Sequence, residues 1–111
     1  MIDNRIEMGN DQIQFRIRKS IHDKDPKAVA YLFGSRARGD FRADSDWDIL
    51  ILVDDIQVTN EIEDKFRDDL YDIELESGQI ISTLIYPKDY WKSRMIYSPL
   101  FHNVSREGIL L

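Results

Sequence analysis

The stretch LFGSRARGDFRADSDWDILILV, residues 32–53, contains the most informative pattern in the chain. Two apolar runs flank a loop that contains two glycines, three arginines, two serines and four aspartates. A turn between strands needs glycine and one or two short polar residues, but it does not need so many charges of both signs. The loop therefore calls for an explanation beyond chain reversal.

The segments around this loop predict alternating helices and strands. Ile13, Ile17 and Ile21 recur at helical spacing in residues 10–25, and a second such pattern covers residues 60–78. Short β-rich apolar runs predict strands at 28–33, 48–53 and 79–86, and shorter helices are expected at 88–95 and 99–106. The expected fold class is α/β (α+β), a small mixed sheet flanked by helices.

Composition narrows the range of functions. A chain of 111 residues predicts one domain, residues 1–111, and its 42% hydrophobic and 32% charged residues are typical of a globular protein. The net charge of −6 argues against broad nucleic-acid binding. No apolar run approaches the roughly 20 residues that cross a bilayer, and MIDNRIEMGND lacks an apolar signal core, so a cytoplasmic location and no membrane contact are expected. The absence of cysteine excludes disulfides and thiolate metal sites.

The first half of the loop has the features of a phosphate-binding turn. Gly34 permits close approach of backbone to a ligand, and residues 35–38 can form a short helix that Gly39 ends. The unpaired N–H groups of a first helical turn attract anions. The Ser35 hydroxyl and the forked donors of Arg36, Arg38 and Arg42 also match phosphate oxygens. Gly34, Ser35, Arg36 and Arg38 are the candidate nucleotide ligands.

The second half of the loop supplies carboxylates. Asp46 and Asp48 are two residues apart at the start of a strand, so they should project from one face while Trp47 projects from the other. Paired carboxylates beside a phosphate-binding turn are suited to Mg²⁺ carrying a nucleoside triphosphate. Each feature alone has a plainer explanation, such as a solvated helix face or a half-exposed strand entrance. Their occurrence together, in this order, favours the metal and nucleotide site.

The motifs GSRARG and SDWD resemble the G-S-x-x-x-G and S-D-x-D signature of the DNA polymerase beta nucleotidyltransferase superfamily. More narrowly, the short chain is similar to the minimal nucleotidyltransferase group. The resemblance implies a polymerase-beta-like fold, ATP or another nucleoside triphosphate bound at Gly34 and Ser35, and two divalent metals at Asp46 and Asp48. It also implies an Mg²⁺-dependent transferase that moves a nucleotide monophosphate onto an acceptor.

One departure from the family pattern affects the second metal. The family usually carries a third carboxylate on the strand after the long helix, but QIISTLIY, residues 79–86, contains no acid. Glu74 or Glu76 could substitute only if the long helix ends early. Loss of the third acid would weaken the catalytic metal more than the nucleotide-bound one, so nucleotide binding could persist without catalysis.

The resemblance also bears on partners. Members of the minimal group are often antitoxins paired with a separately encoded, all-helical toxin, and a chain this short leaves little room for an acceptor-binding domain. Two functions therefore remain open. The chain is either a nucleotidyltransferase with an unidentified acceptor or a catalytically weakened nucleotide-binding module that neutralises a helical toxin. A protein partner or self-association is compatible with either.

Overall fold

A computed structural model describes residues 8–111 of the chain. Most of the N-terminal stretch used above to judge a signal segment lies outside these residues. The central feature is a four-stranded sheet in the order β3-β2-β1-β4. Its strands are β1 (Val29–Phe33), β2 (Trp47–Val53), β3 (Ile81–Pro87) and β4 (Ile109–Leu110). β1 is antiparallel to both β2 and β4, whereas β2 and β3 run parallel, so the sheet is mixed as expected.

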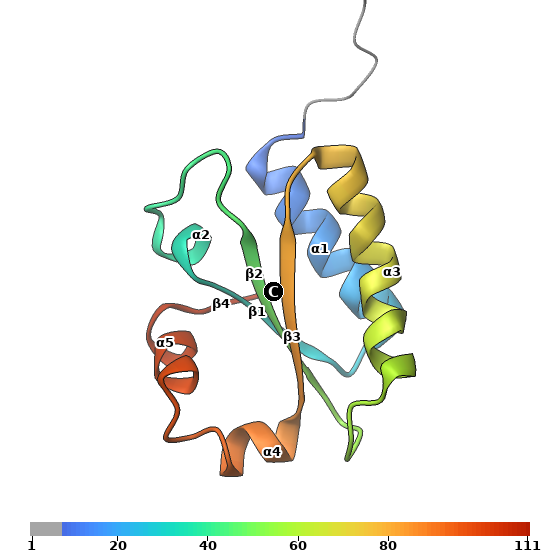
Figure 1. The fold of residues 1–111 in the computed structure, drawn as a ribbon, viewed down its shortest axis with the longest axis vertical. Coiled ribbons are helices and arrows are strands. Elements are labelled where there is room, and N and C mark those ends of the chain that lie inside the picture. The colour runs from blue at the N-terminus through green and yellow to red at the C-terminus, as the bar shows by residue number, and fades with distance from the viewer. Residues whose placement is uncertain (1–7) are drawn as a thin grey trace, which may run out of the picture.

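Two helices cover one face of this sheet, α1 (Asn10–Lys24) and α3 (Asn60–Ser77) (Figure 1). Each buries a stripe at helical spacing, and the α1 stripe is the predicted set of Ile13, Ile17 and Ile21. These stripes pack on alternate residues of β1 and β2 and form the larger core cluster. Trp47 belongs to this cluster, so its ring points away from the face that carries Asp48.

The opposite face is covered by α4 (Lys88–Ser93) and α5 (Pro99–Glu107) (Figure 1). A smaller core forms here from Leu50 and Leu52 of β2 with Trp91 and Val104. After α5 the chain adds β4 to the sheet beside β1, a strand that the sequence interpretation did not predict. No helix among residues 8–111 has the length and apolar character needed to cross a membrane.

The short helix α2 (Ser35–Arg38) follows β1 directly. Gly34 precedes it with a φ of 75°, and Gly39 ends it in the left-handed conformation with a φ of 89°. This confirms the short helix predicted over residues 35–38. β1, α2 and the loop to β2 therefore place the charged stretch at one end of the sheet (Figure 1).

Candidate functional site

The Gly34 turn lies against the carboxylate of Asp48. With φ 75° and ψ −160°, Gly34 has a backbone conformation that is essentially restricted to glycine. A Cβ added at this position would collide with Asp48 Oδ2 and lie 3.1 Å from Asp48 Cγ. Because Asp48 pairs with Phe33 across β1 and β2, the strand register itself sets the carboxylate beside the turn. The structure thus brings the expected phosphate-binding turn and one expected metal ligand together.

Asp46 and Asp48 influence each other electrostatically. Asp48 is half-buried at the start of β2, while Asp46 precedes the strand and is exposed. Burial raises the pKa of the Asp48 carboxyl above its usual value, and the negative charge of Asp46 raises it further. Two mutually repelling carboxylates are stabilised by a hard divalent cation, so the donor set suits Mg²⁺.

Arg36 has a structural role, which corrects the expectation that it contacts phosphate. Its side chain is only 6% exposed and lies between the rings of Phe41 and Trp47, with the guanidinium carbon 4.7 Å and 4.6 Å from their centroids. Its guanidinium donates hydrogen bonds to the carbonyls of Ala43 and Ser45 and to the side chains of Asn10 and Gln79. With its donors engaged in this way, Arg36 holds the loop from Gly39 to Asp46 against the sheet instead of presenting itself to a ligand.

Arg38 remains at the site, and the structure adds a neighbour that the sequence did not reveal. The exposed Arg38 guanidinium donates to Asp40 and, from Nη1, to both carboxylate oxygens of Glu107 at 3.3 and 3.2 Å. The hydrogen bond that Arg38 donates to Glu107 is the main cause of the raised pKa of Arg38. Glu107 ends α5, and the packing of α5 on β1 together with the unpredicted pairing of β4 with β1 brings it here, so no local sequence pattern could have identified it.

The strand that usually carries the family's third carboxylate presents a hydroxyl at the site. Ser82 of β3 pairs in register with Asp48 of β2, so the two side chains lie on the same face of the sheet. Thr83 pairs with Ile49 and faces the α3 side, where its hydroxyl accepts a hydrogen bond from Arg67 Nε. Among residues 8–111, no three His, Cys, Asp or Glu side chains gather closely enough to hold a metal ion together.

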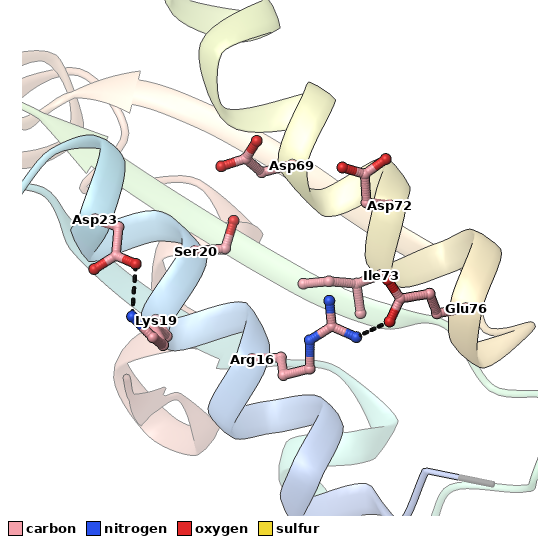
Figure 2. Close-up of a pocket in the computed structure, with 8 residues that line it drawn as sticks. All are labelled: Arg16, Lys19, Ser20, Asp23, Asp69, Asp72, Ile73 and Glu76. Atoms are coloured by element: carbon pink, nitrogen blue, oxygen red, sulfur yellow. Dashed lines mark hydrogen bonds and ion pairs between the residues drawn. The ribbon is translucent and has the colours of Figure 1, made fainter. Parts of the chain in front are cut away.

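Glu74 and Glu76 do not replace the missing acid, so that alternative is wrong. The helix α3 continues to Ser77, and its buried residues pack on the face of the sheet that carries Trp47, opposite to the face that carries Asp48. Glu74 accepts a hydrogen bond of 3.0 Å from the backbone N–H of Ile81. Glu76 pairs with Arg16 of α1 at the rim of a cavity of about 300 Å³ between α1 and α3 (Figure 2).

Comparison with known families agrees with this geometry. The family model described as Polymerase beta, Nucleotidyltransferase matches residues 16–111. The chain belongs to this family. The match includes both signature motifs and continues through β3, α4 and α5. Ser82 and Glu107 therefore both lie within the part of the chain that matches the family.

Solved structures share the fold of this family member. A toxin–antitoxin complex of MntA with a mutant HpeT matches with a TM-score of 0.61 and 23% identity, covering 88% of this chain and 70% of that one. A toxin–antitoxin structure with AMP-PNP gives 0.58 and 26% identity, covering 87% and 70%. A protein described as a minimal nucleotidyltransferase gives 0.60 and 20% identity, covering 98% and 100%. A comparison with curated protein sequences gives no match.

Proposed function

We propose that this chain binds a nucleoside triphosphate with Mg²⁺ at the Gly34 turn and transfers the nucleotide monophosphate to an acceptor. The observation that carries the proposal is the contact between Gly34 and the Asp48 carboxylate. A turn that lets phosphate approach the backbone and a carboxylate that can hold its metal have to be adjacent for this chemistry, and here they touch. Membership of the nucleotidyltransferase family supports the same reaction class.

Each residue of the site has a distinct part in the proposal. Asp46 and Asp48 would hold Mg²⁺, which when bound offsets phosphate charge and makes the α-phosphorus more electrophilic. Gly34 lets the Asp48 carboxylate lie directly against the turn, while the Ser35 hydroxyl and the Arg38 guanidinium would donate to phosphate oxygens. An acceptor hydroxyl would release its proton to solvent and its oxygen would bond to the α-phosphorus. The bond from that phosphorus to the bridging oxygen would break, and pyrophosphate would leave.

Ligand-induced thermal stabilisation tests the binding step. ATP with Mg²⁺ should raise the melting temperature of the wild-type protein, because a ligand at 100 times its Kd stabilises the native state by about 2.7 kcal/mol. Asp48→Asn should abolish the rise. Asp72→Asn, which makes the same charge change at an exposed position of α3, should keep it. A wild-type protein whose melting temperature does not respond to Mg²⁺ with any of the common nucleoside triphosphates would refute the proposal.

The alternative, a nucleotide-binding module without catalysis, is favoured by one observation. Ser82 stands beside Asp48 where the family usually has an acid. Incubation with ATP labelled at the α-phosphate separates the two functions, because only a transferase attaches the label covalently to an acceptor. Ligand-induced stabilisation without label transfer to any acceptor, including a co-purified partner, would favour the binding module.

We also propose that the chain acts together with a second protein. Two of the similar solved structures are toxin–antitoxin complexes, one of them with AMP-PNP. Co-expression with the product of an adjacent gene, followed by light scattering on the purified material, should give a stable hetero-complex. If the chain purified alone forms a stable homodimer and excludes that product, self-association is the better description.

A further inference from the structure

The topology of the sheet brings the end of α5 to the nucleotide site. β4 is antiparallel to β1, with Ile109 opposite Leu32, so the start of β4 lies beside the end of β1. The Gly34 turn follows the end of β1, and Glu107 immediately precedes the start of β4. Residues more than seventy positions apart in the sequence are therefore neighbours at this edge.

Glu107 is held more firmly than an ordinary surface carboxylate. The N–H of Gly108 donates to the carbonyl of Val104, and Ile109 is then fixed in the sheet, so the backbone is restrained on both sides of Glu107. Its side chain is only 14% exposed, whereas that of Arg38 is 47% exposed. The carboxylate of Glu107 is thus anchored, whereas an arginine side chain has many rotamers. The contact with Glu107 therefore restricts the conformations of the Arg38 side chain.

The contacts of Arg38 leave part of its guanidinium available. Nε donates to Asp40 and Nη1 donates to both oxygens of Glu107, and within residues 8–111 these are the hydrogen bonds of this side chain. The two Nη2 hydrogens of the planar fork are not engaged by these carboxylates. A guanidinium whose orientation is already fixed can donate to a phosphate oxygen with little further loss of conformational freedom.

Arg38 also starts at the Gly34 turn. Its backbone N–H donates to the carbonyl of Gly34 at 3.1 Å, and the Asp48 carboxylate lies against the same glycine. The side chain that Glu107 contacts is therefore anchored at the turn beside Asp48.

We propose that Glu107 is a positioning residue of the nucleotide site, which holds the Arg38 guanidinium near the Gly34 turn so that Arg38 can donate to the triphosphate. This inference rests on the proposed function, because it assigns Arg38 a phosphate ligand. Glu107 does not touch the ligand in this arrangement. Its effect passes through Arg38, and losing it costs affinity because an unrestrained arginine must be ordered on binding.

A double-mutant cycle on nucleotide affinity tests this inference. The probe is AMP-PNP with Mg²⁺, and its Kd is measured by calorimetry for wild type, Glu107→Gln, Arg38→Ala and the double variant. Glu107→Gln keeps the shape of the side chain and should weaken binding about three- to tenfold. Arg38→Ala should weaken binding at least as much, and adding Glu107→Gln to it should cause no further loss, because the residue that Glu107 positions is then absent.

A matched control separates position from charge. Glu63 pairs with Arg67 on α3 at 3.6 Å, so Glu63→Gln removes a similar carboxylate from a similar pair and should leave the Kd unchanged. Glu107→Asp retains the charge with a shorter reach and should weaken binding less than Glu107→Gln does. Should Glu107→Gln fail to fold by circular dichroism, Glu107→Asp with and without Arg38→Ala provides the same cycle.

The outcomes separate this inference from the proposed function. If wild type binds AMP-PNP but Glu107→Gln leaves the Kd unchanged, or if its effect is fully retained in the Arg38→Ala background, the positioning role is overturned and the proposed function stands. If wild type binds no nucleotide while Mg²⁺ is present, the proposed function fails, and the positioning role fails with it.

Discussion

Ser82 of β3 lies directly beside Asp48 of β2, paired in register on the same face of the sheet. The hydroxyl of Ser82 thus occupies the position next to the expected metal ligand from which a neighbouring strand could supply a further carboxylate. Ser82 is exposed, and the adjacent Ile80 and Leu84 are exposed too, so this part of the face is accessible to a ligand. A single substitution at Ser82 can therefore test whether the missing acid limits metal binding.

Installing the acid should strengthen metal binding. Ser82→Asp would add a third carboxylate beside Asp46 and Asp48, and the affinity for Mg²⁺ in the presence of AMP-PNP should rise by about tenfold, since affinity for hard cations grows with ligand charge. Calorimetric titration measures this rise. Where an acceptor is present, label transfer from ATP should increase as well.

Thr83→Asp is the control for that experiment. It introduces the same charge on the next residue, but on the α3 side, where Arg67 already donates to the Thr83 hydroxyl at 3.3 Å. The new carboxylate would find a partner in Arg67, so the protein should fold and its affinity for Mg²⁺ should not change. Equal gains in affinity from both variants would mean that the effect is one of net charge and that no metal sits beside Asp48.

Gly34→Ala should damage both stability and binding. The ε-region backbone at Gly34 costs a residue with a Cβ about 1–3 kcal/mol, and the added atom would displace the Asp48 carboxylate. Urea denaturation should show that loss, and stabilisation by ATP with Mg²⁺ should disappear. Gly78→Ala is the matched control, because Gly78 also has a positive φ of 70° but a Cβ there would meet nothing within 4 Å. It should lose stability and retain the response to ligand.

Arg36→Lys should destabilise the fold although the charge is conserved. Lysine cannot reproduce the forked hydrogen bonds to Ala43 and Ser45 or the stacking between two rings, so a loss of about 2–4 kcal/mol in the free energy of unfolding is expected. Urea denaturation provides the measurement. Arg42→Lys, at an exposed position of the same loop, should change stability by less than about 0.5 kcal/mol. A tolerated Arg36→Lys with weakened nucleotide binding would restore Arg36 as a ligand.

Local patterns predicted the parts of this molecule that depend on neighbouring residues. The spacing of Ile13, Ile17 and Ile21 gave the buried face of α1, and the pair of Gly34 and Gly39 gave the bounds of α2. The opposite facing of Trp47 and Asp48 followed from strand geometry alone.

Long-range contacts account for what the sequence did not reveal. Arg36 has the side chain of a typical phosphate ligand. Only its hydrogen bonds to Asn10, Gln79 and the loop carbonyls show that its donors are already engaged. Glu107 reaches Arg38 through the pairing of a two-residue strand, which is too short to produce a periodic signal. Predicting either contact requires the tertiary structure.

The raised pKa of Asp48 predicts a specific pH dependence of stability in the absence of metal. Burial is its main cause, followed by repulsion from Asp46, and both make the folded protein hold the Asp48 proton more tightly than the unfolded chain does. Between the ordinary pKa of 3.8 and the raised value, the folded state binds more protons, so stability falls as the pH rises through this interval. Above this interval, the charged Asp48 lowers the free energy of unfolding by an amount that no longer changes with pH.

Asp48→Asn should remove this destabilising charge. In buffer with EDTA, the variant should unfold at higher urea concentration than wild type at pH 7, and the difference should shrink as the pH falls toward 3.8. Asp72→Asn, at an exposed position of α3, serves as the control for a lost surface charge and should not show this trend. Adding Mg²⁺ with ATP should reverse the order at pH 7, because only wild type retains the ligand that the cation needs. An Asp48→Asn variant that is less stable than wild type at pH 7 without metal would show that the carboxylate stabilises the fold, contrary to the role proposed here.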